Sequence, residues 1–155
     1  MSAMKQGELA PDFTLPDSDG APRRLSALLA TGPVVLFFYP AAMTAGCTAE
    51  TCHFRDLAAE FAELSAQPVG VSGDPVDTQR RFTEAHEFGF PLLSDTDGEV
   101  ATRFGVKRSL GPLRTKRQTF VIDTDRTVLA VIRSEFRMSV HADKALDVLR
   151  AHRRA

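Results

Sequence analysis

The feature that most constrains the fold is a continuous apolar run from Val34 to Tyr39. Successive side chains of a β-strand point to opposite faces, so a run without polar positions is typical of a strand buried on both faces. A loop follows, and then a segment from Thr48 to Leu64 in which an apolar stripe begins at Phe54. The i, i+3, i+4, i+7 spacing of that stripe predicts an amphipathic helix. The centre of the chain is therefore predicted to be a buried strand that leads into a helix.

Shorter segments of both kinds occupy the rest of the chain. The predicted strands are 13–15, 23–25, 69–71, 92–93, 119–122 and 128–132, and the other predicted helices are 26–29, one opened by Asp74-Pro75, 99–104 and 142–152. Turn residues at 17–20 and 123–126 predict hairpins. This order predicts an α/β fold with a central mixed sheet flanked by helices and an N-terminal β-hairpin. A thioredoxin-like sandwich fits the order, which alone leaves a flavodoxin-like fold open.

Length and charge narrow the class of protein. With 155 residues, 43% of them hydrophobic, we expect a single domain over residues 1–155 with one hydrophobic core. The balance of 19 Lys and Arg against 20 Asp and Glu predicts no broad field that would attract nucleic acid or an anionic membrane. No apolar run is long enough to span a bilayer, and the first residues lack the apolar core of a secretory signal. We therefore expect a cytoplasmic protein.

The chain has two cysteines, Cys47 and Cys52, too few for a disulfide-scaffolded secreted fold. In a reducing compartment, such a close pair indicates redox chemistry or metal binding. Cys47 falls at the start of the predicted helix, where free backbone N–H groups and the helix dipole favour an anion. A thiolate is such an anion, and it is the nucleophilic form of cysteine. The alternative is that both cysteines are inert core residues.

Attack of a thiolate on a peroxide gives a sulfenic acid, which condenses with a second thiol. Cys52 is the only second thiol in the chain. In an intact helix an i to i+5 pair has its Cα atoms about 8.6 Å apart, whereas a disulfide needs about 6.8 Å or less. We therefore expect the first helical turns to unwind when Cys47 and Cys52 form a disulfide.

Pro40, Thr44 and Cys47 match the peroxiredoxin pattern Pro-x-x-x-Thr-x-x-Cys. The wider stretch FFYPAAMTAGCTAETCHFRD resembles the peroxiredoxin Q subfamily, also called bacterioferritin comigratory protein (BCP). Further matching blocks lie at 7–13, 90–95 and 117–123, so the resemblance covers nearly the whole chain.

This resemblance implies a thioredoxin fold and a thiol-dependent peroxidase that reduces hydrogen peroxide and organic hydroperoxides. The implied site consists of Cys47 as peroxidatic cysteine, Cys52 as resolving cysteine, Thr44 and Arg117 as the groups that polarise the peroxide and hold the thiolate, and Pro40 as a shield. Thioredoxin or a similar dithiol protein would then reduce the intramolecular disulfide. No metal or organic cofactor is needed, because sulfur carries both electrons. The resemblance also favours a monomer, with a dimer as the alternative.

Four further features carry weaker expectations. Ala45 stands where the subfamily usually has proline, which we expect to loosen the loop or ease unwinding. Glu50 could pair with an arginine near the site, but we favour a role in the first helical turn. His53 is expected on the helix surface, since a zinc site would need more ligands. The basic cluster of Lys107, Arg108, Arg114, Lys116 and Arg117 is expected to be a solvated loop rather than a site that steers anionic partners.

Two other functions remain open from the sequence. A disulfide oxidoreductase or thiol sensor would use the same cysteines, although thioredoxin-type exchange normally uses Cys-x-x-Cys and this pair has four intervening residues. A non-catalytic binding domain would carry cysteines that merely respond to oxidation, and it would show slow, stoichiometric oxidation without turnover.

Overall fold

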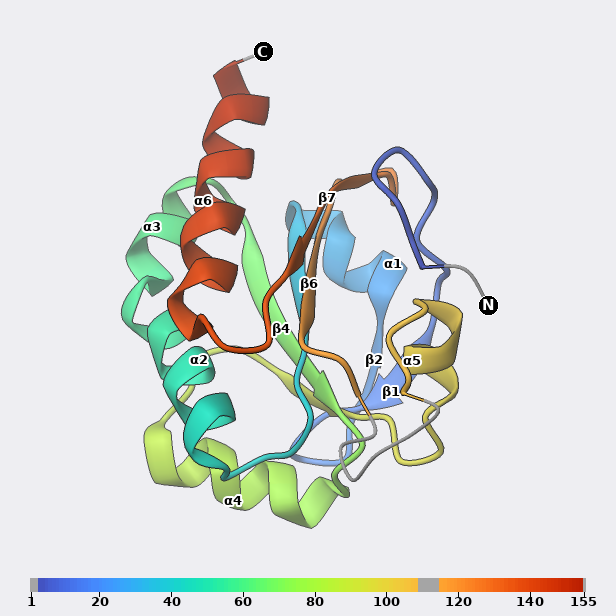
Figure 1. Cartoon of the computed structure of the whole chain (residues 1–155), viewed down its shortest axis with the longest axis vertical. Coiled ribbons are helices and arrows are strands. Elements are labelled where there is room, and N and C mark those ends of the chain that lie inside the picture. Colours follow the sequence, from blue (N-terminus) through green and yellow to red (C-terminus); the bar gives the residue numbers. More distant parts are fainter. Residues whose placement is uncertain (1–2, 109–114, 155) are drawn as a thin grey trace.

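A five-stranded mixed sheet forms the centre of the computed structural model, which describes residues 3–108 and 115–154 (Figure 1). The strand order is β5-β4-β3-β6-β7. The strands are β3 (Val34–Phe38), β4 (Gln67–Ser72), β5 (Leu92–Ser94), β6 (Gln118–Ile122) and β7 (Val128–Arg133). β3, β4 and β5 are parallel, whereas β6 is antiparallel to both of its neighbours. The antiparallel pairs confirm the predicted mixed sheet and exclude the all-parallel flavodoxin-like alternative.

A separate hairpin precedes the sheet. Its strands are β1 (Thr14–Pro16) and β2 (Pro22–Arg24), which pair antiparallel across the turn at 17–20. Asp17 holds this turn, because its side chain accepts hydrogen bonds from the backbone N–H groups of Asp19 and Ala21. The structure thus confirms the predicted N-terminal β-hairpin.

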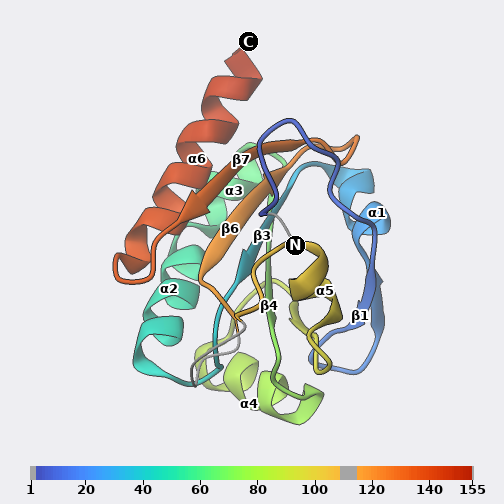
Figure 2. The same cartoon turned by 45° about the vertical axis from the view of Figure 1, so that its right-hand side comes forward.

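Helices lie on both sides of the sheet (Figure 2). The helical elements are α1 (Leu25–Leu28), η1 (Leu29–Thr31), α2 (Ala45–Asp56), α3 (Ala58–Glu63), α4 (Val76–His86), α5 (Glu99–Arg103) and α6 (Met138–Arg154). Side chains of α1 and α5 join the apolar core on one face of the sheet, whereas those of α2, α3, α4 and α6 join the core on the other face. No helix in the described ranges is both long enough and apolar enough to cross a bilayer.

The apolar run of β3 supplies both cores. Leu36 and Phe38 belong to the core of α1 and α5, whereas Val35, Phe37 and Tyr39 belong to the core of α2, α4 and α6. All five side chains are fully buried. The prediction of a strand buried on both faces is therefore confirmed, but the expected single core is divided into two by the sheet.

Three predicted boundaries or caps are wrong. The helix expected from Thr48 to Leu64 begins at Ala45 and breaks at Leu57, whose φ of −100° and ψ of 16° lie outside the helical range. The last helix begins four residues earlier than predicted, at Met138. Asp74 does not cap α4, since it accepts hydrogen bonds from the Ala42 backbone N–H (2.7 Å) and the Ser72 hydroxyl (2.6 Å). Asp74 therefore stabilises the loop that connects β3 to α2, because Ala42 belongs to that loop.

Candidate active site

Cys47 is the third residue of α2, and its side chain is fully buried. The helix begins directly after Thr44, which has the extended backbone (φ −79°, ψ 156°) of a residue that precedes a helix. The loop before it turns at Met43, which adopts a positive φ of 65°. The Sγ atom thus lies in the first turn of α2, where backbone N–H groups without helical partners favour an anion.

Arg117 is the charged partner of Cys47. Arg117 directly precedes β6, and it is only 7% exposed. Nη2 donates a hydrogen bond to Cys47 Sγ at 3.3 Å, and Nη1 donates one to Glu50 Oε1 at 2.6 Å. The structure therefore brings together two residues of the predicted site that are far apart in the sequence. It also corrects the expectation of a solvated basic loop, because Arg117 is buried.

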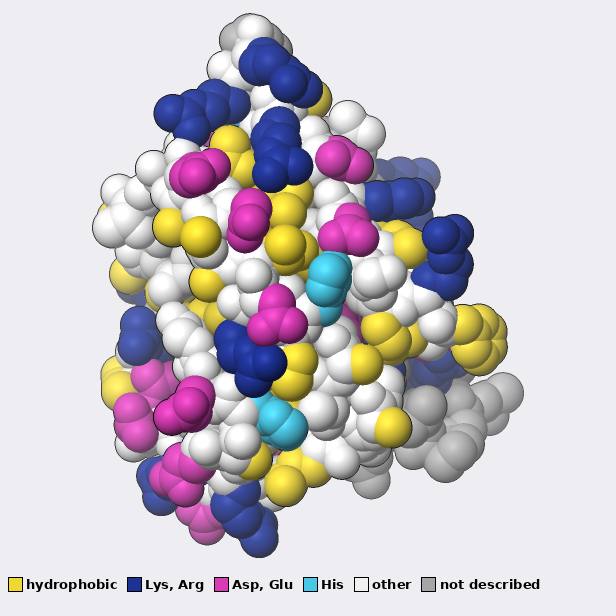
Figure 3. All heavy atoms as spheres, turned by 90° about the vertical axis from the view of Figure 1, so that its left-hand side faces the viewer, with side chains coloured by type: hydrophobic (Ala, Val, Ile, Leu, Met, Phe, Trp, Pro, Cys, Tyr) yellow, Lys and Arg dark blue, Asp and Glu magenta, His cyan; other side chains and the backbone are white. Residues whose placement is uncertain are grey.

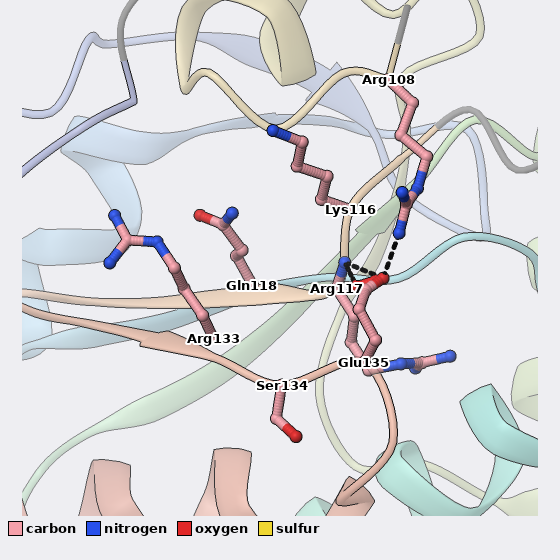
Figure 4. Close-up of a pocket in the computed structure, with 7 residues that line it drawn as sticks. All are labelled: Arg108, Lys116, Arg117, Gln118, Arg133, Ser134 and Glu135. Atoms are coloured by element: carbon pink, nitrogen blue, oxygen red, sulfur yellow. Dashed lines mark hydrogen bonds and ion pairs between the residues drawn. The ribbon is translucent and has the colours of Figure 1, made fainter. Parts of the chain in front are cut away.

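The backbone of Arg117 is held separately from its side chain. Its N–H donates to Glu135 Oε2 at 2.9 Å, and Glu135 also pairs with Arg108. Figure 4 shows these groups around an open pocket of about 300 Å³, with the Arg117 side chain extending toward α2 rather than into the pocket. Of the other members of the basic cluster, Lys107 and Lys116 are exposed, which agrees with the expectation of a solvated loop for these two residues. Arg114 lies outside the described residues.

Glu50 is the second acid–base group of the site. It is fully buried on α2, three residues after Cys47 and on the same side of the helix. Burial raises the pKa of its carboxyl to about 7, and the Arg117 guanidinium offsets part of this effect. Burial alone would lower the pKa of Arg117, but Glu50 and Cys47 raise it overall. The favoured role in the first helical turn is wrong, and the pairing with an arginine is the alternative that the structure confirms.

His141 extends the buried network and was not predicted. Its side chain is fully buried, its Nε2 lies 2.8 Å from the Ser134 carbonyl oxygen, and its Nδ1 lies 2.8 Å from Thr119 Oγ1. Nδ1 is also 3.6 Å from Glu50 Oε2. The sequence offered little signal for His141, because the last helix was expected to begin one residue after it. Burial lowers the pKa of this imidazole.

The remaining residues of the predicted site lie close to Cys47 in the chain. Thr44 is exposed, and its hydroxyl donates to the Ala41 carbonyl at 2.8 Å. Pro40 is half-buried directly after Tyr39, in the same loop. Cys52 is half-buried on α2 and packs against the same core as Cys47, and both thiols are free.

His53 follows Cys52 and links two helices. Its Nε2 lies 2.7 Å from Asp143 Oδ1 of α6. The imidazole is therefore a half-buried contact between helices rather than a simple surface residue.

Within the described ranges, no group of three or more His, Cys, Asp and Glu residues could hold a metal ion. Figure 3 shows that acidic and basic side chains are intermixed over the face that includes α2, α3 and α6.

A buried cysteine at a helix start, paired with an arginine, on a mixed sheet flanked by helices defines a class of thiol-dependent redox proteins. Residues 6–131 match the model of the AhpC/TSA family, and the chain belongs to that family.

Individual relatives place the chain among the peroxiredoxins. It is similar to the crystal structure of peroxidoxin BcpB from Mycobacterium tuberculosis, with 64% identity, a TM-score of 0.92, and coverage of 96% of this chain and 97% of that chain. It is 36% identical over 146 residues to the chloroplastic peroxiredoxin Q of Sedum lineare, covering 94% of this chain and 78% of that protein. A structure of bacterioferritin comigratory protein from Xanthomonas campestris, determined to study alkyl peroxide reduction, has a TM-score of 0.86 and 32% identity, covering 96% of this chain and 99% of that chain.

These relatives confirm the resemblance to the peroxiredoxin Q and BCP group and the thioredoxin-like fold. Membership of the family supports peroxidase activity and makes the protein an oxidoreductase.

Proposed function

We propose that this protein reduces hydrogen peroxide and organic hydroperoxides in a cycle that uses Cys47 and Cys52. One observation carries the proposal: Cys47 Sγ lies in the first turn of α2, with the Arg117 guanidinium donating to it at 3.3 Å. A buried thiolate needs a compensating positive charge, and arginine supplies one that stays protonated.

In the first step the Cys47 thiolate attacks one oxygen of the peroxide. An S–O bond forms as the O–O bond breaks, which gives Cys47 sulfenic acid and a hydroxide or alkoxide that takes up a proton. Arg117 can stabilise the developing charge because its guanidinium is already fixed by Glu50. The products are water from hydrogen peroxide or an alcohol from an organic hydroperoxide.

We assign Thr44 and Pro40 to the wall of the peroxide site. The Thr44 hydroxyl donates to the Ala41 carbonyl, so its oxygen lone pairs remain able to accept a hydrogen bond from the peroxide O–H. Pro40 has no N–H and a fixed φ, which suits a rigid shield at the mouth of the loop.

In the second step Cys52 attacks the sulfenic acid, and a disulfide forms with loss of water. Both cysteines lie within the continuous helix α2, where an i to i+5 pair is about 8.6 Å apart at Cα. Because a disulfide needs about 6.8 Å or less, the turns between Cys47 and Cys52 must unwind. A thioredoxin-type dithiol would then restore both thiols, which places the cycle in a reducing compartment such as the cytoplasm.

Steady-state turnover with thioredoxin, its reductase and NADPH tests the cycle. Cys47→Ser should abolish peroxide consumption, whereas Cys52→Ser should consume one equivalent and then stall. Undiminished cycling of Cys52→Ser would show that Cys52 is not the resolving thiol. Rapid reduction of insulin without peroxide turnover would instead favour a disulfide oxidoreductase.

A further inference from the structure

A chain of hydrogen bonds leads from the protein core to the Thr44 hydroxyl, through the loop that precedes α2. Its central link is the peptide group that joins Ala41 to Ala42. The N–H of this group donates to Asp74 Oδ2 at 2.7 Å, and its carbonyl oxygen accepts from Thr44 Oγ1 at 2.8 Å. Because a peptide group is planar, its C=O and N–H turn together. Asp74 therefore sets the direction of the carbonyl that holds the Thr44 hydroxyl.

The loop between β3 and α2 needs an external contact to keep its shape. Met43 lies between Ala42 and Thr44 and has a φ of 65°, a left-handed conformation that is unfavourable for residues other than glycine. Among the residues that the structure describes, Asp74 is the one whose side chain hydrogen-bonds to loop residues 40–44 from outside the loop. This contact therefore stabilises the turn that carries Thr44.

The carboxylate of Asp74 is in turn fixed from the core. The Ser72 hydroxyl, at the end of β4, donates to the same Oδ2 atom at 2.6 Å. A carboxylate oxygen has two lone pairs, so Oδ2 can accept from both Ser72 and Ala42. Ser72 Oγ accepts from Gln79 Nε2 at 2.9 Å, and Gln79 Oε1 accepts from the Tyr39 hydroxyl at 2.6 Å. The side chains of Ser72, Gln79 and Tyr39 are buried, so the core determines where Asp74 lies.

We propose that Asp74 is a positioning residue of the peroxide site, which fixes the peptide group between Ala41 and Ala42 and so directs the lone pairs of the Thr44 hydroxyl toward the peroxide. The inference rests on the role of Thr44 proposed above. Successive hydrogen bonds polarise one another, so the contact of Asp74 with the N–H also makes the Ala41 carbonyl a better acceptor. The effect of Asp74 on the peroxide step therefore passes through Thr44.

Two substitutions of Asp74 test its role as a hydrogen-bond acceptor. Each reduced protein is mixed with hydrogen peroxide and quenched at intervals, and mass spectrometry follows loss of the Cys47 thiol. Asp74→Ala removes the acceptor and should lower the rate constant for peroxide about tenfold. Asp74→Asn keeps a side-chain oxygen in the same place and should stay within about threefold of the wild type. Asp77→Ala, which removes an exposed carboxylate of α4, is the control and should leave the rate unchanged.

A double-mutant cycle tests whether Asp74 acts through Thr44. Thr44→Val replaces the hydroxyl with a methyl group of similar size, and in this background Asp74→Ala should cost less than about twofold in rate. General damage to the loop would instead give the same loss in both backgrounds. Ser72→Ala removes the hydrogen bond that orients Asp74, whereas Gln79 Nε2 keeps its bond to the Leu93 carbonyl. This variant should show the same dependence on the Thr44 hydroxyl, so the test does not depend on Asp74→Ala alone.

The inference is overturned if the losses from the substitutions at 44 and 74 multiply, if the Asn and Ala variants of Asp74 behave alike, or if Thr44→Val leaves the rate unchanged. The wild-type arm separates the inference from the proposed function. A wild type whose Cys47 thiol survives peroxide contradicts the peroxidase proposal itself. A wild type that reacts with peroxide and loses activity independently at the two positions contradicts only the role of Asp74.

Discussion

At the scale of single residues, one guanidinium serves two acceptors. Arg117 donates to Cys47 Sγ through Nη2 and to Glu50 Oε1 through Nη1, and all three side chains are buried. The planar fork of arginine allows both bonds at fixed geometry, which the single ammonium of lysine does not. The position of Cys47 Sγ relative to the guanidinium therefore depends on Glu50 as well as on Arg117.

Replacing Arg117 tests this geometry. We expect Arg117→Lys to lower the second-order rate constant for peroxide by about 10²–10³-fold, the range found when a preorganised donor is lost. Arg133→Lys is the matched control, because Arg133 is exposed on β7. Rapid-quench thiol counting measures both, and a loss below about threefold for Arg117→Lys would contradict its assigned role.

Glu50 should make stability depend on pH. Its pKa is raised by burial from 4.5 to about 7, so between these values the folded state holds a proton that the unfolded state has released. The contribution of Glu50 to the free energy of unfolding therefore falls as pH rises through this window, by about 3 kcal/mol at most.

Glu50→Gln removes this titration. Urea unfolding of the reduced proteins should show the wild type losing stability relative to Glu50→Gln between about pH 4.5 and 7, the window set by the two pKa values. Curves that stay parallel across that range would contradict a raised pKa for Glu50.

At the scale of elements, the proposed cycle requires α2 to present a reactive first turn and then to unwind. It begins at Ala45, the position at which the subfamily resemblance leads us to expect proline, and ends after three turns at the break around Leu57. Proline is well suited to the first position of a helix. Thr44 already has the extended backbone that a residue before proline requires.

Ala45→Pro should consequently be tolerated. We expect a gain of about 0.4–1 kcal/mol in the free energy of unfolding, with the peroxide rate constant within about tenfold of the wild type. Thermal denaturation and rapid-quench kinetics measure the two quantities. A destabilised protein, or a larger change in rate, would show that the loop before Cys47 is not already ordered as the structure has it.

The elements also show which features sequence patterns could predict. The burial of β3 on both faces follows from the local apolar pattern, and it was predicted. The break at Leu57 and the burial of Glu50 were not, because charged side chains are usually exposed and the partner of Glu50 is 67 residues away. Local patterns cannot supply a contact that only the assembled sheet creates.

At the scale of the whole molecule, one sheet separates two apolar cores. β3 contributes to both, with Leu36 on one side and Phe37 on the other. Because the cores share this strand, we propose that residues 1–155 behave as a single cooperative domain. The sequence contains no tryptophan, so its single tyrosine supplies the intrinsic fluorescence. This residue, Tyr39, is buried in the core on the α2 side, and its fluorescence therefore follows the unfolding of that core.

Leu36→Ala tests this cooperativity. Truncating a fully buried leucine on the α1 side should cost about 2–5 kcal/mol, and it should shift the unfolding midpoints of Tyr39 fluorescence and far-UV circular dichroism together. Leu9→Ala, at a position that is 62% exposed, is the control and should change stability by less than about 0.5 kcal/mol. Separate midpoints for the two probes would contradict a single domain.

The most direct test of the central claim is a thiol count after one turnover. Fully reduced protein is mixed with one equivalent of hydrogen peroxide and quenched within seconds, and the remaining thiols and any disulfide are mapped by mass spectrometry. The proposed cycle predicts that both thiols disappear and that a Cys47–Cys52 disulfide forms. Survival of both thiols would contradict it, because Cys47 would then not be activated despite its position beside Arg117.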